Sequence, residues 1–248
     1  MHKQILFPLV TLLGVMLLAL SAQAHCAWIE APSSTASVDE TVLIRSFWAD
    51  PDDEPGQRDT ADLELYYRSP SHETSPLKPD RKERYQYTQK QLGTEGSHVF
   101  YAIREPARHR LTQYRDFAKA ITSVGVAQVT EPIGLELEIT PLVPVDPLLK
   151  EVPVVVTFLG EVLPEATVQV VESLEPGGDV YQSLHGNHAL EIVTDHKGQA
   201  VIPLGKDHQH IVKVRHQVGS SEVPQETGRW IRSVVFRSTL YLDAGIGK

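Results

Sequence analysis

The feature that most constrains the fold is a series of short apolar and β-branched segments, separated by turn-forming residues, that fills most of the chain after residue 40. Segments of this length and composition are typical of β-strands. We predict strands at 41–48, 63–67, 85–91, 97–104, 135–139, 152–159, 166–171, 189–194, 199–204, 210–218 and 230–242. The turns Gly93–Gly96 and Asp195–Gly198 indicate β-hairpins. The sequence therefore predicts a mainly β protein.

The predicted strands form two groups, separated by the segment Glu131–Gly134. The second group has about seven strands, at the spacing of an immunoglobulin-like or transthyretin-like sandwich. We therefore expect two antiparallel β-sandwich domains, at residues 25–131 and 132–244. In the strand that opens the second domain, Leu137 and Ile139 alternate with Glu136 and Glu138, which predicts that one of its faces is solvated.

One segment, residues 106–124, has the spacing of a helix. Leu111, Tyr114, Phe117, Ala118 and Ile121 recur at three- and four-residue intervals. Proline at position 106 and glycine at position 125 are suited to the start and the end of a helix. We expect this helix to cover a sheet near the junction of the two domains, with Arg110, Arg115 and Lys119 solvated on or near its polar side.

Residues 1–24 have the features of a secretory signal peptide. An apolar run, Ile5–Leu20, follows Lys3, and Ala22 and Ala24 precede the expected cleavage site. An uncleaved anchor is the alternative, but the run has 16 residues, whereas a membrane span needs about 20. A lipoprotein modified at Cys26 would need a small residue where His25 stands. We expect cleavage after Ala24 and a periplasmic protein with no stable membrane insertion.

The composition excludes several classes of function. The chain has 23 basic and 32 acidic residues, a net charge of −9, and no basic cluster along the sequence, which argues against nucleic acid and anionic lipid as partners. Cys26 is the only cysteine, so an internal disulfide cannot form. The motifs of phosphate loops, serine hydrolases, zinc proteases and thiol redox enzymes are absent. We therefore expect a protein that is not an enzyme.

Cleavage after Ala24 would make His25 the N-terminal residue. A free α-amine has a pKa near 8, so it is partly deprotonated at neutral pH and can bind a metal together with the ring of the same residue. The alternative is a frayed terminus with no function. The acidic run 50–56 is a second candidate for cation binding through oxygen ligands, although such a run is more commonly a solvated loop.

The second domain is rich in histidine, the preferred ligand of several transition metals. Its histidines are His185, His188, His196, His208, His210 and His216. Residues two apart share one face of a strand, so His216 lies on the same face as Val212 and Val214 and is at least partly buried. We predict His25, His216, His188 and His185 as metal ligands. The alternative is that the histidines lie on loops or form ordinary hydrogen bonds.

Several segments resemble a family of exported bacterial proteins that are often labelled periplasmic components of cobalt or nickel uptake systems (NikM/NikK-like). In chain order they are HCAWIEAP (25–32), YRDFAKA (114–120), LELEITP (135–141), TDHKG (194–198), VKVRH (212–216) and the closing strand 230–242. The resemblance implies a periplasmic two-domain β protein with a role in transition-metal binding. His25 and His216 match histidines of that family.

Three functions follow from these observations. The first is a metal-binding accessory protein that presents Ni²⁺ or Co²⁺, with Cu²⁺ and Zn²⁺ as alternatives, to a membrane metal-uptake transporter. The second is a metal-free periplasmic β-sandwich that binds a protein or glycan partner. The third is copper redox chemistry at an N-terminal histidine brace. The first is the function that we expect.

Overall fold

The computed structural model describes residues 26–31, 34–49, 60, 62–82, 85–173, 189–206, 208–223 and 228–244. Over these ranges the chain forms β-strands and one short 3-10 helix, η1 (Ser220–Glu222). The prediction of a mainly β fold is confirmed. In the same ranges, the helical content is too short and too polar for a membrane crossing.

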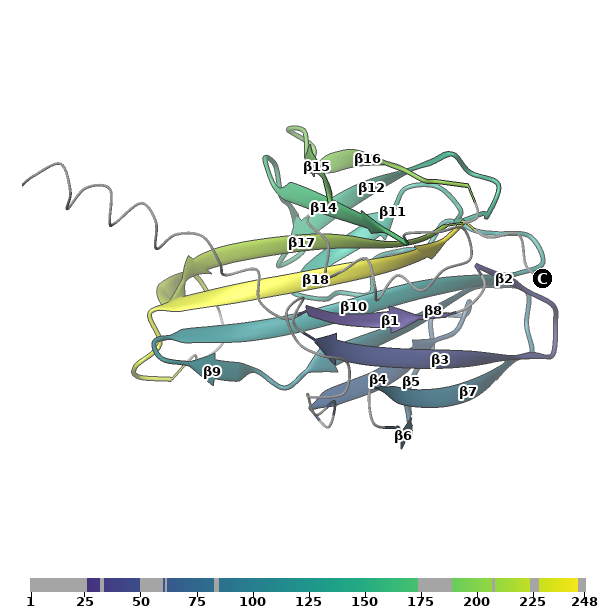
Figure 1. The fold of residues 1–248 in the computed structure, drawn as a ribbon, viewed down its shortest axis with the longest axis horizontal. Helices are drawn as coiled ribbons and strands as arrows, with labels where there is room; N and C mark the ends of the chain where they lie inside the picture. The colour runs from purple at the N-terminus through teal and green to yellow at the C-terminus, as the bar shows by residue number, and fades with distance from the viewer. Residues whose placement is uncertain are drawn as a thin grey trace, which may run out of the picture.

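A ten-stranded central sheet runs through the whole molecule (Figure 1). Its strands, in order across the sheet, are β15 (Leu190–Val193), β14 (Thr167–Glu172), β17 (Gln209–Gly219), β18 (Ser233–Asp243), β10 (Thr112–Val124), β8 (Gly96–Arg104), β4 (Leu63–Arg68) and β5 (Thr74–Leu77), and the short β2 (Thr35–Ala36) and β9 (Ala107–His109) also pair with β10. The central strands β10 and β18 are parallel. The other pairs along this order are antiparallel.

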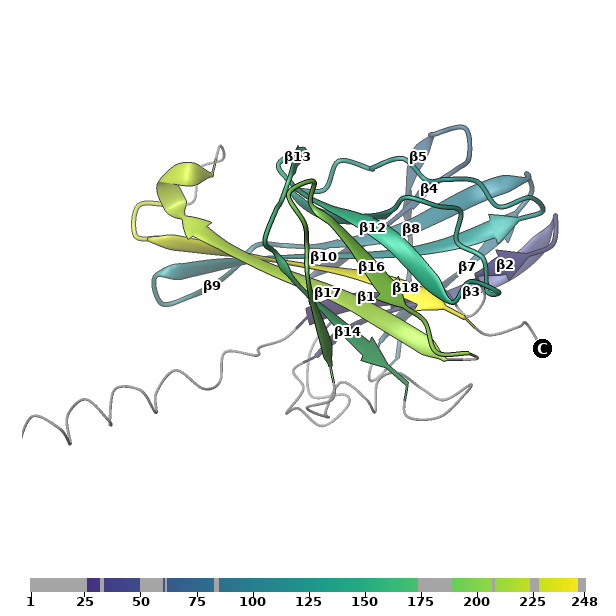
Figure 2. The same cartoon turned by 90° about the horizontal axis from the view of Figure 1, so that it is seen from above.

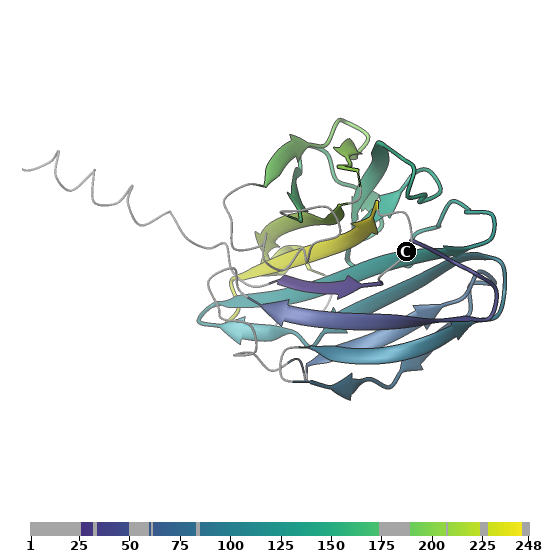
Figure 3. The same cartoon turned by 45° about the vertical axis from the view of Figure 1, so that its right-hand side comes forward.

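Two four-stranded sheets cover the central sheet, one on each face (Figure 2). The N-terminal cover sheet contains β1 (Cys26–Glu30), β3 (Glu40–Ala49), β7 (Gln86–Leu92) and β6 (Asp80–Arg81). The C-terminal cover sheet contains β11 (Leu137–Pro141), β12 (Glu151–Phe158), β13 (Glu161–Val162) and β16 (Gln199–Pro203). Figure 3 shows the purple β1 and blue β3 lying over the long central strands. The result is a three-layered β-sandwich.

Each interface between layers holds its own hydrophobic core. On β10, Ala118 and Ala120 belong to the core under the N-terminal cover sheet, whereas Phe117 and Ile121 belong to the core under the C-terminal cover sheet. Side chains alternate between the faces of a strand, so the two cores lie on opposite faces of the central sheet. The central sheet takes strands from both sides of residue 131, and the division into domains at 25–131 and 132–244 stays a prediction.

The helix predicted at 106–124 is wrong, because this segment forms β9 and β10. From Arg115 to Val124 every residue of β10 is buried, since cover sheets lie on both faces of the central sheet. A strand that is buried on both faces loses the apolar-polar alternation by which strands are usually distinguished from helices. Pro106 and Gly125 border a strand here as well as they would border a helix.

The two predicted hairpins are also wrong, although their strands are present. β7 pairs with β3 in the N-terminal cover sheet, while β8 pairs with β10 and β4 in the central sheet. In the same way, β15 belongs to the central sheet and β16 to the C-terminal cover sheet. Gly198 does have the expected positive φ of 70°. The turns therefore carry the chain between layers, as connections of sandwiches commonly do.

Candidate functional site

The start of β1 is the part of the fold next to the predicted ligand His25. Cys26 is 5% exposed and pairs with Ala49 of β3. The Thr239 hydroxyl of β18 donates a hydrogen bond of 2.7 Å to the carbonyl oxygen of Ala27. The first strand is therefore fixed to both the N-terminal cover sheet and the central sheet. His25 itself lies outside the described residues, as do His185 and His188.

His216 lies on β17, on the face that Val212 and Val214 contribute to the core under the C-terminal cover sheet. Its ring packs edge-on against Phe158, with 4.6 Å between the centroids. Burial lowers the pKa of His216, although Glu222 acts in the opposite direction. The neutral imidazole, which is the form that binds metals, is therefore favoured. The predicted partial burial of His216 is confirmed, and its role as a ligand stays a prediction.

β1 and His216 lie on opposite faces of the central sheet. β1 belongs to the N-terminal cover sheet, whereas His216 points toward the C-terminal cover sheet. Across the part of the chain that the structure describes, no group of three or more histidine, cysteine, aspartate or glutamate side chains is arranged so that it could hold a metal ion.

The other described histidines have structural contacts or lie on the surface. The hydroxyl of Tyr67 donates to His98 Nδ1 at 2.7 Å, and His98 Nε2 donates to the carbonyl oxygen of Thr94 at 2.8 Å. His196 is exposed on the turn between β15 and β16. His98 therefore holds the turn at Thr94 against the core. The sequence alone did not indicate this structural role.

His208 and His210 lie at the start of β17, beside Glu172 of β14. His208 Nδ1 is 3.3 Å from a carboxylate oxygen of Glu172, and His210 Nε2 is 3.7 Å from the same oxygen. His208 Nδ1 donates to the carbonyl oxygen of Ser173 at 2.7 Å, and the N–H of Gly205 donates to His210 Nε2 at 3.0 Å. The pair therefore fixes the end of the β14–β17 ladder.

We expect His210 to make the fold sensitive to mild acid. Burial, with a smaller contribution from His208, lowers the pKa of His210 from 6.5 to about 4. Between these values the unfolded chain binds the proton more readily, so stability falls as the pH is lowered from 6.5 to 4, by about 3 kcal/mol. Thermal unfolding at pH 7 and pH 4.5 measures this loss for the wild type and for His210→Gln.

The two proteins share all other titrating groups, Glu172 and His208 included, so the difference between their pH profiles isolates His210. The variant should lose less stability on acidification. Between pH 7 and pH 4.5, its Tm should therefore fall by several degrees less than the Tm of the wild type. Parallel profiles would contradict the assignment.

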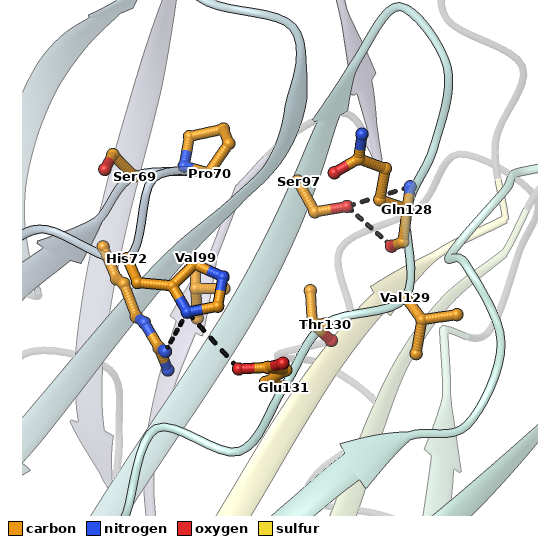
Figure 4. Close-up of a pocket in the computed structure, with 10 residues that line it drawn as sticks. Ser69, Pro70, His72, Ser97, Val99, Gln128, Val129, Thr130 and Glu131 are labelled. Atoms are coloured by element: carbon orange, nitrogen blue, oxygen red, sulfur yellow. Dashed lines mark hydrogen bonds and ion pairs between the residues drawn. The ribbon is translucent and has the colours of Figure 1, made fainter.

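A shallow surface pocket lies between β4, β8 and the segment that follows β10 (Figure 4). It has a volume of about 330 Å³ including its open side. Arg68 donates to His72 Nδ1 at 2.9 Å and to the carbonyl oxygen of Pro132 at 2.9 Å. Ser97 donates to the carbonyl oxygen of Gln128 at 2.7 Å. The polar groups of the pocket therefore bind one another, and their hydrogen bonds hold the segment 128–132 against the central sheet.

Of the three basic residues predicted to be solvated, Arg110 is exposed, but the prediction is wrong for Arg115 and Lys119. Both side chains are buried, and they form ion pairs with Glu136 and Glu138 on the segment that enters the C-terminal cover sheet. The Lys119 Nζ donates to Glu138 at 2.7 Å. Glu138 is 1% exposed, so the solvated face predicted for this strand is wrong as well. These charges hold the layers together.

Comparison with known families supports the expectation that the chain belongs to an uncharacterised domain family. The family described as a domain of unknown function (DUF4198) matches residues 22–218. The chain belongs to this family. The match agrees with an uncharacterised domain family and does not itself show a nickel or cobalt role. No curated protein matches the chain.

Solved structures give only distant similarity. The chain is 14% identical to a Salmonella alpha-2-macroglobulin mutant, with a TM-score of 0.32. The matched region covers 88% of this chain and 15% of that protein. It is 12% identical to a DUF4785 family protein from Legionella pneumophila, with a TM-score of 0.31 and coverage of 75% and 51%. For the D0-D1 domain of intimin, the identity is 12%, the TM-score 0.25 and the coverage 88% and 97%.

Proposed function

We propose that this protein is an exported binding protein that captures a divalent transition-metal ion, Ni²⁺ or Co²⁺, and presents it to a membrane uptake system. His25, as the N-terminal residue after signal cleavage, is the principal ligand through its α-amine and imidazole. The resemblance to cobalt and nickel uptake components supports the choice of metal. Cu²⁺ and Zn²⁺ are the competing ions, and copper binds most N and O donor sets more tightly than nickel or cobalt.

The observation that carries this proposal is the pairing of Cys26 with Ala49. Cys26 directly follows His25, and Ala49 directly precedes the acidic run that begins at Asp50. In the sequence, the candidate nitrogen ligand and the start of the acidic run are therefore each next to one member of this strand pair.

The geometry favours the acidic run over His216 as the source of further ligands. His216 faces the C-terminal cover sheet, and the whole central sheet separates it from β1. In contrast, Asp50, Asp52, Asp53 and Glu54 follow β3, the strand to which β1 is paired. Two nitrogen donors from one residue and oxygen donors from a carboxylate suit a labile site, from which the ion can leave by ligand exchange.

The test is a calorimetric titration of the processed protein, beginning at His25, with Ni²⁺, Co²⁺, Cu²⁺ and Zn²⁺. One extra residue before His25 removes the α-amine from the chelate, and His25→Ala removes the imidazole. Each change should weaken binding by more than the 10- to 100-fold that the loss of an outer-shell partner costs. Asp50→Asn with Asp52→Asn should weaken binding less strongly, while His216→Gln serves as the matched control and should leave it unchanged.

Two outcomes would contradict the proposal. Equal affinity of the extended and the processed protein would exclude the amine as a ligand. The absence of saturable binding, together with a Tm that no metal changes, would favour a metal-free module for a protein or glycan partner, because a ligand of the native state must stabilise it. Copper-dependent oxidation of a test substrate would instead favour the redox function.

A further inference from the structure

Two turns that are distant in the sequence meet at one end of the central sheet. The first joins β9 to β10 at Arg110 and Leu111, and the second is the segment 228–232 before β18. The N–H of Arg232 donates to the carbonyl oxygen of Leu111 at 2.8 Å, and Thr112 pairs with Ser233. In Figures 1 and 2 this end projects to the left, beyond both cover sheets.

This end concentrates positive charge around an exposed tryptophan. We name it the basic tip, which consists of Arg108, His109, Arg110, Leu111, Arg229, Trp230 and Arg232, all of them exposed. Trp230 is 63% exposed and Leu111 is 44% exposed, unusual values for such large apolar side chains. The guanidinium of Arg229 lies 5.4 Å from the centre of the Trp230 ring. Residues 107–112 and 228–233 contain no carboxylate.

The basic tip corrects the expectation that the chain lacks a basic cluster. In the sequence, about half the length of the chain separates Arg108 and Arg110 from Arg229 and Arg232. The parallel pairing of β10 with β18 brings the two turns together. The cluster therefore exists only in the folded protein, within a chain whose net charge is −9.

We propose that the basic tip binds the headgroup region of an anionic phospholipid membrane. Guanidinium groups bind phosphate oxygens through paired hydrogen bonds. Tryptophan prefers the interface between headgroups and acyl chains, where its ring is apolar and its N–H is solvated. The combination of one exposed tryptophan, one exposed leucine and four arginines therefore matches the chemistry of that interface.

The size and position of the tip favour a membrane over a protein surface. A stable protein interface takes roughly 20 to 30 residues from each partner, whereas the tip is made of two turns. A lipid surface can adapt to a small projecting end, and basic residues near an anionic leaflet add to binding one by one. The acidic remainder of the chain is screened beyond about 8 Å at physiological salt, so contact through the tip is compatible with the net negative charge.

The test is co-sedimentation of the processed protein, without metal, with vesicles of phosphatidylcholine alone or mixed with phosphatidylglycerol. We expect binding to the anionic vesicles, little binding to the neutral ones, and release at high salt. Arg229→Ser with Arg232→Ser should lower the partition coefficient about tenfold or more. Lys78→Ser with Lys197→Ser removes the same charge elsewhere on the surface and is the matched control.

Trp230 offers a second readout, because its emission should shift to the blue when the ring enters the interface. Trp230→Phe removes that shift while Trp28 and Trp48 remain as internal references. The substituted positions are all exposed, so circular dichroism should show an unchanged fold. Equal binding of the tip variant and the control variant would overturn the proposal. Failure to bind either type of vesicle would also overturn it.

Because the vesicles are tested without metal, this inference does not depend on the proposed function. Loss of metal binding in the His25 variants with normal vesicle binding would leave the membrane contact intact. The reverse result would leave the metal site intact.

Discussion

Replacing Glu138 by glutamine is expected to lower the free energy of unfolding by about 3–5 kcal/mol, the usual effect of breaking a buried ion pair on one side. Glu138 accepts hydrogen bonds from Lys119 at 2.7 Å and from the backbone N–H groups of Ile133 and Gly134, both at 2.9 Å, and Leu135, at 3.2 Å. Glutamine has the same shape but must direct its own N–H₂ group at one of these donors. Lys119, which is 2% exposed, then lacks a full counter-charge.

The carboxylate is held in its charged form by this set of donors. Burial by itself would raise the pKa of Glu138, but Lys119 and the backbone N–H groups bring it below its ordinary value. Gly134 has a φ of 88°, and this left-handed conformation helps the successive N–H groups converge on one carboxylate. Glu138 therefore closes the segment that leads into the C-terminal cover sheet.

Chemical denaturation of three proteins measures the effect. Glu138→Gln and Lys119→Met should each lose several kcal/mol, while the double variant should lose less than the sum, because neither charge is then left alone. For a chain of this size, the single variants should lower the Tm by about 6–20 °C. A loss of less than about 1 kcal/mol in Glu138→Gln, the range of exposed ion pairs, would contradict this role.

The strands that the sequence predicted well have one buried face and one partly open face. β4 has the burial pattern expected from alternation, with Leu63, Leu65 and Tyr67 buried. β17 likewise buries Val212 and Val214 and exposes Arg215. In such strands the alternation of apolar and polar residues shows which face is buried and which faces solvent.

For strands that are buried on both faces, the residue pattern did not predict the environment of the side chains. β10 is buried on both faces, and β11 is buried throughout although Glu138 and Thr140 belong to it. Whether a charged residue faces water or an opposite charge depends on a partner such as Lys119, which lies 19 positions away. The basic tip has the same origin, since only the pairing of β10 with β18 joins its halves.

Asparagine in place of Asp116 should have an effect as large as Glu138→Gln. Asp116 is 1% exposed and binds two arginines from neighbouring strands of the central sheet. Arg237 forms a close bidentate pair with it, with one bond at 2.8 Å, and Arg104 donates to it at 3.4 Å. The Arg104 guanidinium also stacks on Trp48 at 3.9 Å, which links this cluster to the N-terminal cover sheet.

Without the Asp116 carboxylate, the buried guanidinium groups of Arg104 and Arg237 would lose the counter-charge that they share, whereas Asp62, the other carboxylate beside Arg104, is 48% exposed. We expect a loss of about 3–5 kcal/mol. Asp62→Asn is the matched control, since it removes a carboxylate from the same Arg104 at the surface, where ion pairs contribute about 0–1 kcal/mol. Denaturation curves of the two variants decide the matter, because equal losses would show that burial of Asp116 adds nothing. Adding Arg237→Met to Asp116→Asn removes one of the two guanidinium charges that Asp116 binds. The stability that this restores measures how much of the loss in Asp116→Asn came from repulsion between those charges.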